Sequence, residues 1–204
     1  MIQGDAPVSQ PQPVTTIVPE PRRRVFRRLT RSGQMADFAW RWSQRLFFHP
    51  TPVRANAWRC WLLRRFGAKV HRSVVIHPTV RIVHPWNLTI DHGCAIGHNA
   101  VLDCQAAITI GAETRISQFS HLCTATHIYD QRAMPIIGRP ITVGEKCWLA
   151  ADVFVGSGVR VGDSVVLGAR SSVFRDVPSD VVMVGSPAQP IRDAAQTQPS
   201  SDLT

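Results

Sequence analysis

One histidine of this chain differs from the others because it lies in a stretch that interrupts a repeat. His127 follows Thr-Ala-Thr and precedes two further polar side chains, Tyr129 and Asp130. The unperturbed pKa of histidine is near neutrality, so a positioned histidine can take the proton of a hydroxyl group that attacks an electrophile. We therefore choose His127 as a candidate general base. The alternative is a solvated loop histidine without a chemical role.

A general base needs a neighbouring group that fixes which ring nitrogen carries the proton. The candidates are a backbone carbonyl in the same stretch, the Asp130 carboxylate and the Asp103 carboxylate. No serine or cysteine has a visible base beside it in the sequence. We therefore expect direct transfer to the attacking group, without a covalent enzyme intermediate.

The other histidines and the cysteines do not predict a metal site. His71, His77, His92 and His98 lie at or next to repeat positions on different strands, so we expect no metal ion among them. The five cysteines are odd in number and lack Cys-x-x-Cys spacing. This pattern favours reduced thiols over a disulfide framework or a zinc site.

The repeat that His127 interrupts is a six-residue spacing of aliphatic side chains. A helix would show apolar residues every 3.6 positions, and a half-buried strand would show strict alternation. A period of six fits a short strand and a tight corner, with one inward side chain per strand and three strands per coil. We therefore predict an all-β fold, a parallel β-helix of about five coils. The fifteen inward positions are Val70, Ile76, Ile82, Ile90, Ile96, Leu102, Ile110, Ile116, Leu122, Val143, Leu149, Val155, Val161, Leu167 and Val173.

The spacing is longer after Ile82, Leu102 and Leu122. The first two steps are eight residues long, which indicates the same two-residue bulge at one corner of successive coils. The third step is 21 residues long, so residues 123–142 are expected to project as a loop. Loops on a rigid scaffold often carry function, and His127 lies in this one. We also expect the glycines that follow repeat positions to supply corner backbone angles that other residues avoid.

The net charge of +9 comes from the N-terminal third of the chain. Residues 1–69 hold 13 Lys and Arg against 3 Asp and Glu, whereas residues 70–204 hold 10 against 11. Composition and helix breakers predict four segments. These are a disordered basic lead (1–33), a helical N-terminal region (34–69) with helices over 34–48 and 54–66, the β-helix domain (70–184), and a C-terminal cap and tail (185–204).

Tryptophans alternate with arginines in the helical region. Such amphipathic helices are typical of a cap on the end of a solenoid or of a membrane-surface element, and both interpretations stay open. The second interpretation predicts a peripheral contact with the inner face of the membrane through residues 22–66, and we expect no binding to nucleic acid. The chain shows neither a membrane-spanning apolar stretch nor the apolar core of a signal peptide. We therefore expect a cytoplasmic protein or one peripheral to the inner face of the membrane.

Several stretches together resemble the hexapeptide-repeat acyltransferases, which are left-handed β-helix enzymes that use acetyl-CoA. The resemblance is strongest to the branch of colanic acid biosynthesis acetyltransferases, and it covers about residues 36–192. The stretches that carry it are WRCWLLRRFGAKV (58–70), IHPTVRIVHPWNLTI (76–90), SQFSHLCTATHIYD (117–130), CWLAADVFVGSGVRVGDSVVLGARSSVFRDVP (147–178) and VGSPAQPIR (184–192).

The resemblance implies a homotrimer with active sites between neighbouring chains and acetyl-CoA as co-substrate. It implies an O-acetyltransferase that acts on a sugar of an exopolysaccharide or on its lipid-linked precursor, with His127 as the base. Many relatives have aspartate directly after this histidine, where the present chain has Ile128. We expect Trp148, Ala151, Ala169, Arg175 and Arg192 to bind acetyl-CoA; the resemblance itself assigns Ala151 and Ala169, and Arg192 lies in its C-terminal stretch. Alternatively, Trp148 closes an edge of the prism and the small residues only allow the corners to turn. We expect Asn99, Cys104, Tyr129 and Asp130 to bind the acceptor, with Asp103 assisting the base.

Two other functions compete with this one. The first is acetylation of a small-molecule hydroxyl or amine, as in serine or xenobiotic acetyltransferases. The second is a non-catalytic β-helix scaffold, which would need neither His127 nor the C-terminal stretch that resembles a coenzyme A site.

Overall fold

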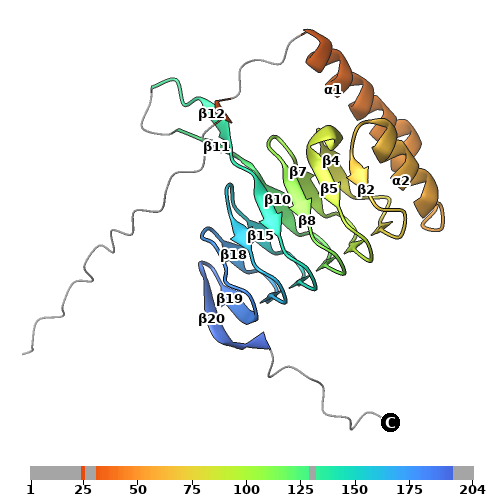
Figure 1. Cartoon of the computed structure of the whole chain (residues 1–204). Coiled ribbons are helices and arrows are strands. Elements are labelled where there is room, and N and C mark those ends of the chain that lie inside the picture. The colour runs from red at the N-terminus through yellow and green to blue at the C-terminus, as the bar shows by residue number, and fades with distance from the viewer. Residues whose placement is uncertain (1–23, 26–30, 129–131, 195–204) are drawn as a thin grey trace, which may run out of the picture.

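The computed structural model describes residues 24–25, 31–128 and 132–194 of the 204-residue chain. Most of it is a parallel β-helix, a prism with three flat faces (Figure 1). Face 1 consists of β2 (Lys69–Val70), β5 (Leu88–Ile90), β8 (Ile108–Ile110), β13 (Ile141–Val143) and β16 (Arg160–Val161). Face 2 consists of β3 (Val75–Ile76), β6 (Ala95–Ile96), β9 (Arg115–Ile116), β14 (Trp148–Leu149), β17 (Val166–Leu167), β19 (Val181–Gly185) and β20 (Ala188–Asp193). Face 3 consists of β4 (Arg81–Val83), β7 (Val101–Asp103), β10 (His121–Cys123), β15 (Phe154–Val155) and β18 (Ser172–Val173).

The predicted inward positions form the core of the prism. All fifteen are at most 5% exposed. Parallel register places each inward side chain over its equivalent in the next coil, as in the face 2 column of Ile76, Ile96, Ile116, Leu149 and Leu167. Burial of such a side chain contributes about 1.5–3 kcal/mol to the free energy of unfolding. The repeated column therefore accounts for the stability of a fold with very short strands.

The β-helix has about six turns, one more than the sequence predicted. Face 2 continues past β17 into β19, and Val177 forms a further bridge to Val161 on face 1. The spacing after Val173 is irregular, which hid this last turn. β20 then pairs antiparallel with β19 and forms a C-terminal hairpin, at the position where the sequence predicted a cap. The tail from residue 195 onward lies outside the described residues.

The corner between faces 3 and 1 carries all three insertions. The first coil has the 3₁₀ turn η2 (Pro85–Asn87) there, and the second has residues 104–107. The third has a hairpin of β11 (Ala125–His127) and β12 (Ile136–Gly138). This confirms the predicted common corner. The projecting segment is 124–140, slightly shorter than the predicted 123–142, because Cys123 ends β10 and residues 141–142 belong to β13.

The hairpin also pairs with the N-terminal lead. β1 (Arg24–Val25) lies antiparallel to β12, with Arg24 opposite Gly138. The outer edge of a two-stranded hairpin has unpaired backbone groups, and an extended segment can satisfy them. The predicted lead of 1–33 therefore differs from the structure at these two residues and at its end, since α1 (Arg31–Ser43) begins at Arg31. The rest of that lead lies outside the described residues.

The glycines that follow repeat positions serve close packing between coils, not the corner angles that the sequence predicted. Positive φ angles at the corners are adopted by other residues, among them Asn99 (φ 56°) and Asp152 (φ 61°). A Cβ added to Gly111 would lie 2.7 Å from the carbonyl carbon of Gly144 in the next coil. A Cβ on Gly162 would lie 2.6 Å from a backbone nitrogen. The backbone approach between coils is therefore what requires glycine.

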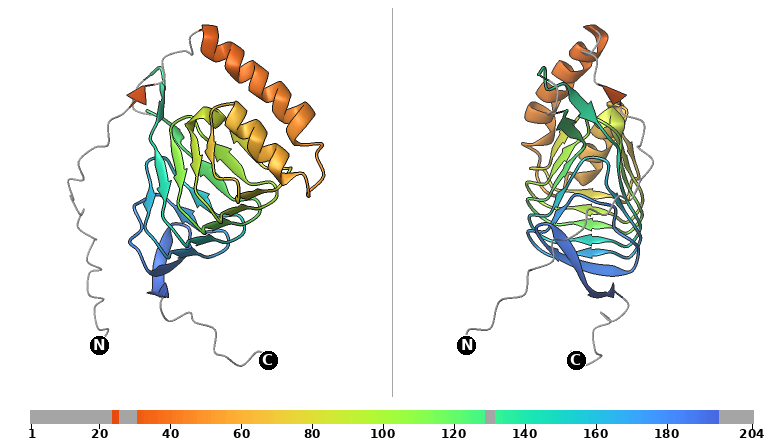
Figure 2. Two further views of the ribbon diagram at one scale, coloured as in Figure 1. Left: turned by 45° about the vertical axis from the view of Figure 1, so that its right-hand side comes forward. Right: turned by 90° about the vertical axis from the view of Figure 1, so that its left-hand side faces the viewer.

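The helical region caps the N-terminal end of the prism, as Figure 2 shows. α1 continues as the π-helix η1 (Gln44–Phe48), and α2 (Asn56–Arg65) follows after a break at the predicted His-Pro-Thr-Pro sequence. The Trp40 indole is buried and donates a hydrogen bond to the Ile82 carbonyl at 2.7 Å. Gly67 ends the cap with a φ of 87°, an angle that favours glycine. The cap interpretation is therefore correct for the inner side of these helices.

Candidate active site

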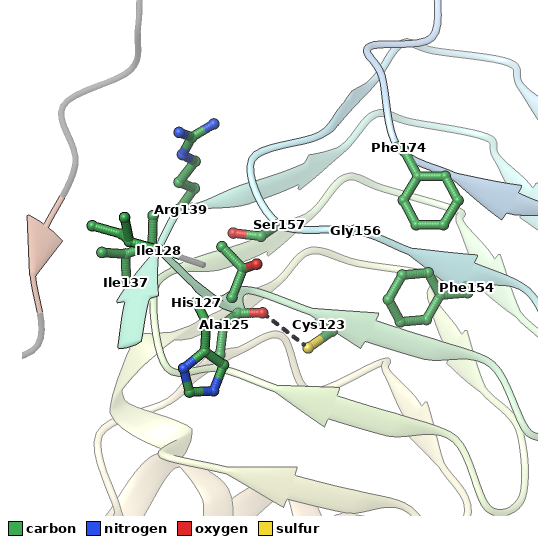
Figure 3. Close-up of a pocket in the computed structure, with 11 residues that line it drawn as sticks. Cys123, Ala125, His127, Ile128, Ile137, Arg139, Phe154, Gly156, Ser157 and Phe174 are labelled. Atoms are coloured by element: carbon green, nitrogen blue, oxygen red, sulfur yellow. Dashed lines mark hydrogen bonds between the residues drawn. The ribbon is translucent and has the colours of Figure 1, made fainter. Parts of the chain in front are cut away.

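A pocket of 470 Å³ lies between the hairpin and face 3 (Figure 3). The hairpin contributes His127 and Ile137, and the outward side chains of face 3 contribute Cys123, Phe154 and Phe174. The rings of Phe154 and Phe174 lie side by side, with centroids 5.7 Å apart. The pocket therefore has an apolar wall on one side and His127 on the other.

The His127 ring is exposed and oriented by its own hairpin. Its Nδ1 lies 2.7 Å from the Met134 carbonyl oxygen. A carbonyl oxygen only accepts hydrogen bonds, so Nδ1 must carry the proton and Nε2 keeps a free lone pair. This is the tautomer that a general base requires. Of the three candidate partners, the structure thus favours a backbone carbonyl of the loop.

Asp103 does not orient this ring. Within the described part of the chain no hydrogen bond joins it to His127, and its Oδ2 lies 3.6 Å from the Cys123 thiol. Asp130 and Tyr129 lie outside the described residues.

Beside the pocket on face 3, Asp103 lies next to two side chains that were not among the predicted site residues, His121 and Cys123. Side-chain atoms of Asp103, His121 and Cys123 all lie within 4.8 Å of one another. Burial lowers the pKa of His121, an effect that the Asp103 carboxylate opposes, and burial raises the pKa of the Cys123 thiol. A usable signal was present: each of these residues lies directly before or after an inward leucine, so its side chain must point outward. The expectation that no metal ion is bound stays a prediction.

Two predicted acceptor-binding residues lie away from the pocket. Cys104 is fully buried and its thiol points to the Leu102 carbonyl at 3.4 Å, so the predicted contact with an acceptor is wrong. Its thiol faces inward because it lies at the bulge, where the six-residue rule does not apply. Asn99 is exposed at the corner between faces 2 and 3, where its backbone N–H bonds to Thr79.

The residues assigned to acetyl-CoA lie on three parts of the surface. Ala151 and Ala169 line a shallow hollow at the corner between faces 2 and 3, together with Phe119. Trp148 stands on face 2, half-exposed, and its indole donates to the Ser117 hydroxyl at 3.1 Å. The two arginines are exposed near the C-terminal end. Arg175 lines a hollow against the C-terminal hairpin, and Arg192 belongs to β20.

Known proteins with a similar sequence are acetyltransferases. The chain is 46% identical over 159 residues to WcaF of Escherichia coli K12, a candidate colanic acid biosynthesis acetyltransferase, and the match covers 78% of this chain and 87% of WcaF. It is 28% identical to galactoside O-acetyltransferase of the same organism, over 71% of each chain. No protein-family profile matches the chain.

Solved structures of the same fold agree with this relationship. A hexapeptide-repeat acetyltransferase from Vibrio cholerae in complex with acetyl-CoA superposes with a TM-score of 0.72 at 27% identity, and the match covers 81% of this chain and 90% of the other. Galactoside acetyltransferase in complex with coenzyme A superposes with a TM-score of 0.73 at 22% identity, covering 87% and 91%. The six-residue β-helix, the projecting hairpin and the extent of identity to WcaF lead to one conclusion: this chain belongs to the hexapeptide-repeat acetyltransferase family.

Proposed function

We propose that this protein transfers an acetyl group from acetyl-CoA to a sugar hydroxyl of an exopolysaccharide or its precursor. The observation that carries the proposal is the hydrogen bond from His127 Nδ1 to the Met134 carbonyl, because it leaves Nε2 free at the edge of a pocket. Nε2 takes the hydroxyl proton while the sugar oxygen attacks the thioester carbonyl carbon. The carbon–sulfur bond then breaks, and the thiolate leaves and receives the proton. Both substrates are present together, so no acyl-enzyme forms.

The acetyl-CoA site that we propose uses the residues that the sequence predicted for it. The pantetheine arm would lie in the hollow of Ala151 and Ala169, where small side chains leave backbone groups accessible. Trp148 would supply an apolar wall. The exposed guanidinium groups of Arg175 and Arg192 would bind phosphates as fixed cations. Complexes of related enzymes with acetyl-CoA and coenzyme A support acetyl-CoA as the co-substrate.

A homotrimer would bring the two halves of this site together. In one chain the Ala151 hollow lies at the corner between faces 2 and 3, whereas His127 projects from the corner between faces 3 and 1. A neighbouring chain could place its own corner against the hairpin and complete the site. Light scattering should therefore give about three times the chain mass of 22.6 kDa. A monomer with full activity would contradict the shared site.

Thiol release from acetyl-CoA tests the reaction class. The purified protein should release thiol only when a sugar acceptor is added, and it should prefer saccharides over serine, chloramphenicol or amines. Turnover of those small molecules alone would favour the small-molecule acetyltransferase. Absence of both turnover and acetyl-CoA binding by calorimetry would favour the scaffold.

We further propose that the acceptor is a lipid-linked saccharide and that residues 22–66 contact the inner face of the membrane. Helices α1, η1 and α2 carry exposed aromatic side chains, among them Trp42, Phe47 and Trp58. Two of these residues are in contact, because the Trp58 indole donates to the Phe47 carbonyl at 2.8 Å, and the Trp58 ring also stacks on Trp61. Exposed tryptophans among arginines are typical of helices that lie on an anionic bilayer. No helix among the described residues is long and apolar enough to cross a membrane.

Vesicle binding tests this contact. Wild type should sediment with anionic vesicles at low salt and be released at high salt. A variant with Phe47→Ser and Trp58→Ser should bind about tenfold more weakly, because each substitution removes apolar area from the bilayer. Val75→Ser, an equally exposed position on face 2, is the matched control and should bind like wild type. If the wild-type protein did not sediment with anionic vesicles at low salt, the membrane contact would be ruled out.

A further inference from the structure

Two buried polar atoms beside the pocket have no hydrogen-bond partner within the described part of the chain. They are Oδ1 of Asp103 and Nε2 of His121. Each unpaired buried polar group costs about 1–3 kcal/mol of folding free energy. Both belong to side chains that point outward from face 3, on neighbouring strands β7 and β10. An unpaired pair at such a position indicates a missing ligand.

The geometry of this pair fits an oxygen atom placed between the two side chains. Side-chain atoms of Asp103 and His121 lie within 4.8 Å of each other. An oxygen about 2.8 Å from each can bridge that separation. The carboxylate can only accept, whereas a neutral imidazole can donate through one nitrogen. A hydroxyl group complements both, since it donates to Asp103 and accepts from His121.

The pair shares a wall with the pocket that holds His127. Cys123 belongs to both, because it lines the pocket and lies against Asp103. The His121 ring meets Phe154 edge to face, with centroids 5.6 Å apart, and Phe154 lines the pocket. A ring-shaped molecule on the Phe154 wall would therefore lie next to the His121 ring.

We propose that Asp103 and His121 together bind one hydroxyl group of the acceptor sugar, a different one from the hydroxyl that is acetylated. The inference rests on the proposed function and adds a specificity determinant to it. By holding the second hydroxyl, the pair turns the sugar so that the reacting hydroxyl faces His127. The two residues are positioning residues, because the proton transfer itself remains with His127.

A metal ion is the competing occupant of this group. Carboxylate, imidazole and thiolate are all ligands of zinc. The thiol, however, must lose its proton to bind a metal, and burial raises the pKa of Cys123. The hydroxyl ligand needs no such proton loss.

The test compares His121→Phe with wild type on the best sugar acceptor and on its deoxy analogues. Phenylalanine keeps the edge-to-face contact with Phe154 and removes only the polar nitrogen atoms. The acceptor KM should rise about tenfold or more, while the KM for acetyl-CoA should not change. One deoxy analogue should be a poor acceptor for wild type, and His121→Phe should no longer discriminate against it. His71→Phe, which changes a histidine that pairs with another ring away from face 3, is the matched control and should behave like wild type.

A second variant and a binding measurement keep the outcome clear. Asp103→Asn should show the same loss of discrimination, since an amide cannot replace the carboxylate as a charged acceptor. Saturation-transfer NMR reports sugar binding without turnover. If wild type bound the sugar without releasing thiol, and His121→Phe weakened that binding, the proposed function would be wrong but this inference would hold. Unchanged discrimination in His121→Phe, no sugar binding by wild type, or a bound metal ion that disappears in His121→Phe would each overturn the inference.

Discussion

Replacement of His127 with alanine is expected to lower kcat/KM for the sugar acceptor about 10²-fold or more. The Met134 carbonyl fixes the proton on Nδ1 of His127 and leaves Nε2 to accept the hydroxyl proton. Alanine removes this acceptor, so the hydroxyl must attack with its proton still bound or transfer it to water. Acceptor-dependent thiol release, measured at saturating acetyl-CoA, checks the loss. Acetyl-CoA binding should be retained, because the substitution leaves the hollow of Ala151 and Ala169 that we propose for the pantetheine arm unchanged.

The matched control is His92→Ala, which removes an exposed histidine from the corner between faces 1 and 2. Its side chain contacts Asp91 and the ring of His71, away from the pocket. His92→Ala should keep the wild-type rate. A His127→Ala enzyme that loses less than about threefold would remove His127 from the role of base.

Replacement of Arg59 with alanine is expected to lower the free energy of unfolding by about 3–5 kcal/mol. The Arg59 side chain is fully buried, although the sequence places it in a basic amphipathic helix. Its Nε donates to the Ile76 carbonyl at 2.9 Å, which links α2 to the first coil. Its two terminal nitrogens donate to the Thr51 hydroxyl and to the carbonyls of Pro52 and Val53 at 2.7–2.9 Å. Alanine removes all four hydrogen bonds, among them the one to the carbonyl of the fully buried Ile76, and it leaves a cavity where the buried guanidinium was.

Thermal unfolding followed by circular dichroism measures this effect, and a drop in Tm of about 10 °C or more is expected for a chain of this length. Arg65→Ala is the matched control, because Arg65 is in the same helix and exposed. It should change the free energy of unfolding by less than about 0.5 kcal/mol. If Arg59→Ala and Arg65→Ala had the same Tm, the hydrogen bonds of the Arg59 guanidinium would not be what stabilises the contact between the cap and the prism.

The residues that fill the inside of the prism could be predicted, because they recur at a fixed spacing along the sequence. Each inward residue from Val70 to Val173 occupies the same place in its own short strand, so a six-residue spacing is sufficient to assign it. The position of the loop could be predicted for the same reason. A step of 21 residues cannot fit into one strand and one corner, and His127 lies within that step.

Contacts made where the period fails could not be predicted. Cys104 lies in a bulge, so its spacing from Leu102 gave no information on whether its thiol faces inward or outward. Arg59 belongs to a helix whose charge pattern suggested exposure, and only the packing of α2 on the first coil buries it.

The sequence by itself thus determined the β-helix and the candidate base, since these depend on repeated local spacing and on one conspicuous interruption. The family was indicated by the resemblance of several stretches to known acyltransferases. The tertiary structure decided the tautomer of His127, through a carbonyl on the other strand of its hairpin. It also decided that Asp103 and His121 lie close together, because these residues are 18 positions apart along the chain but belong to neighbouring strands of face 3. The physical reason is that hydrogen bonds and burial depend on which atoms are close in space. For these residues the close atoms come from an irregular corner or from a neighbouring coil, and the local sequence spacing does not specify either.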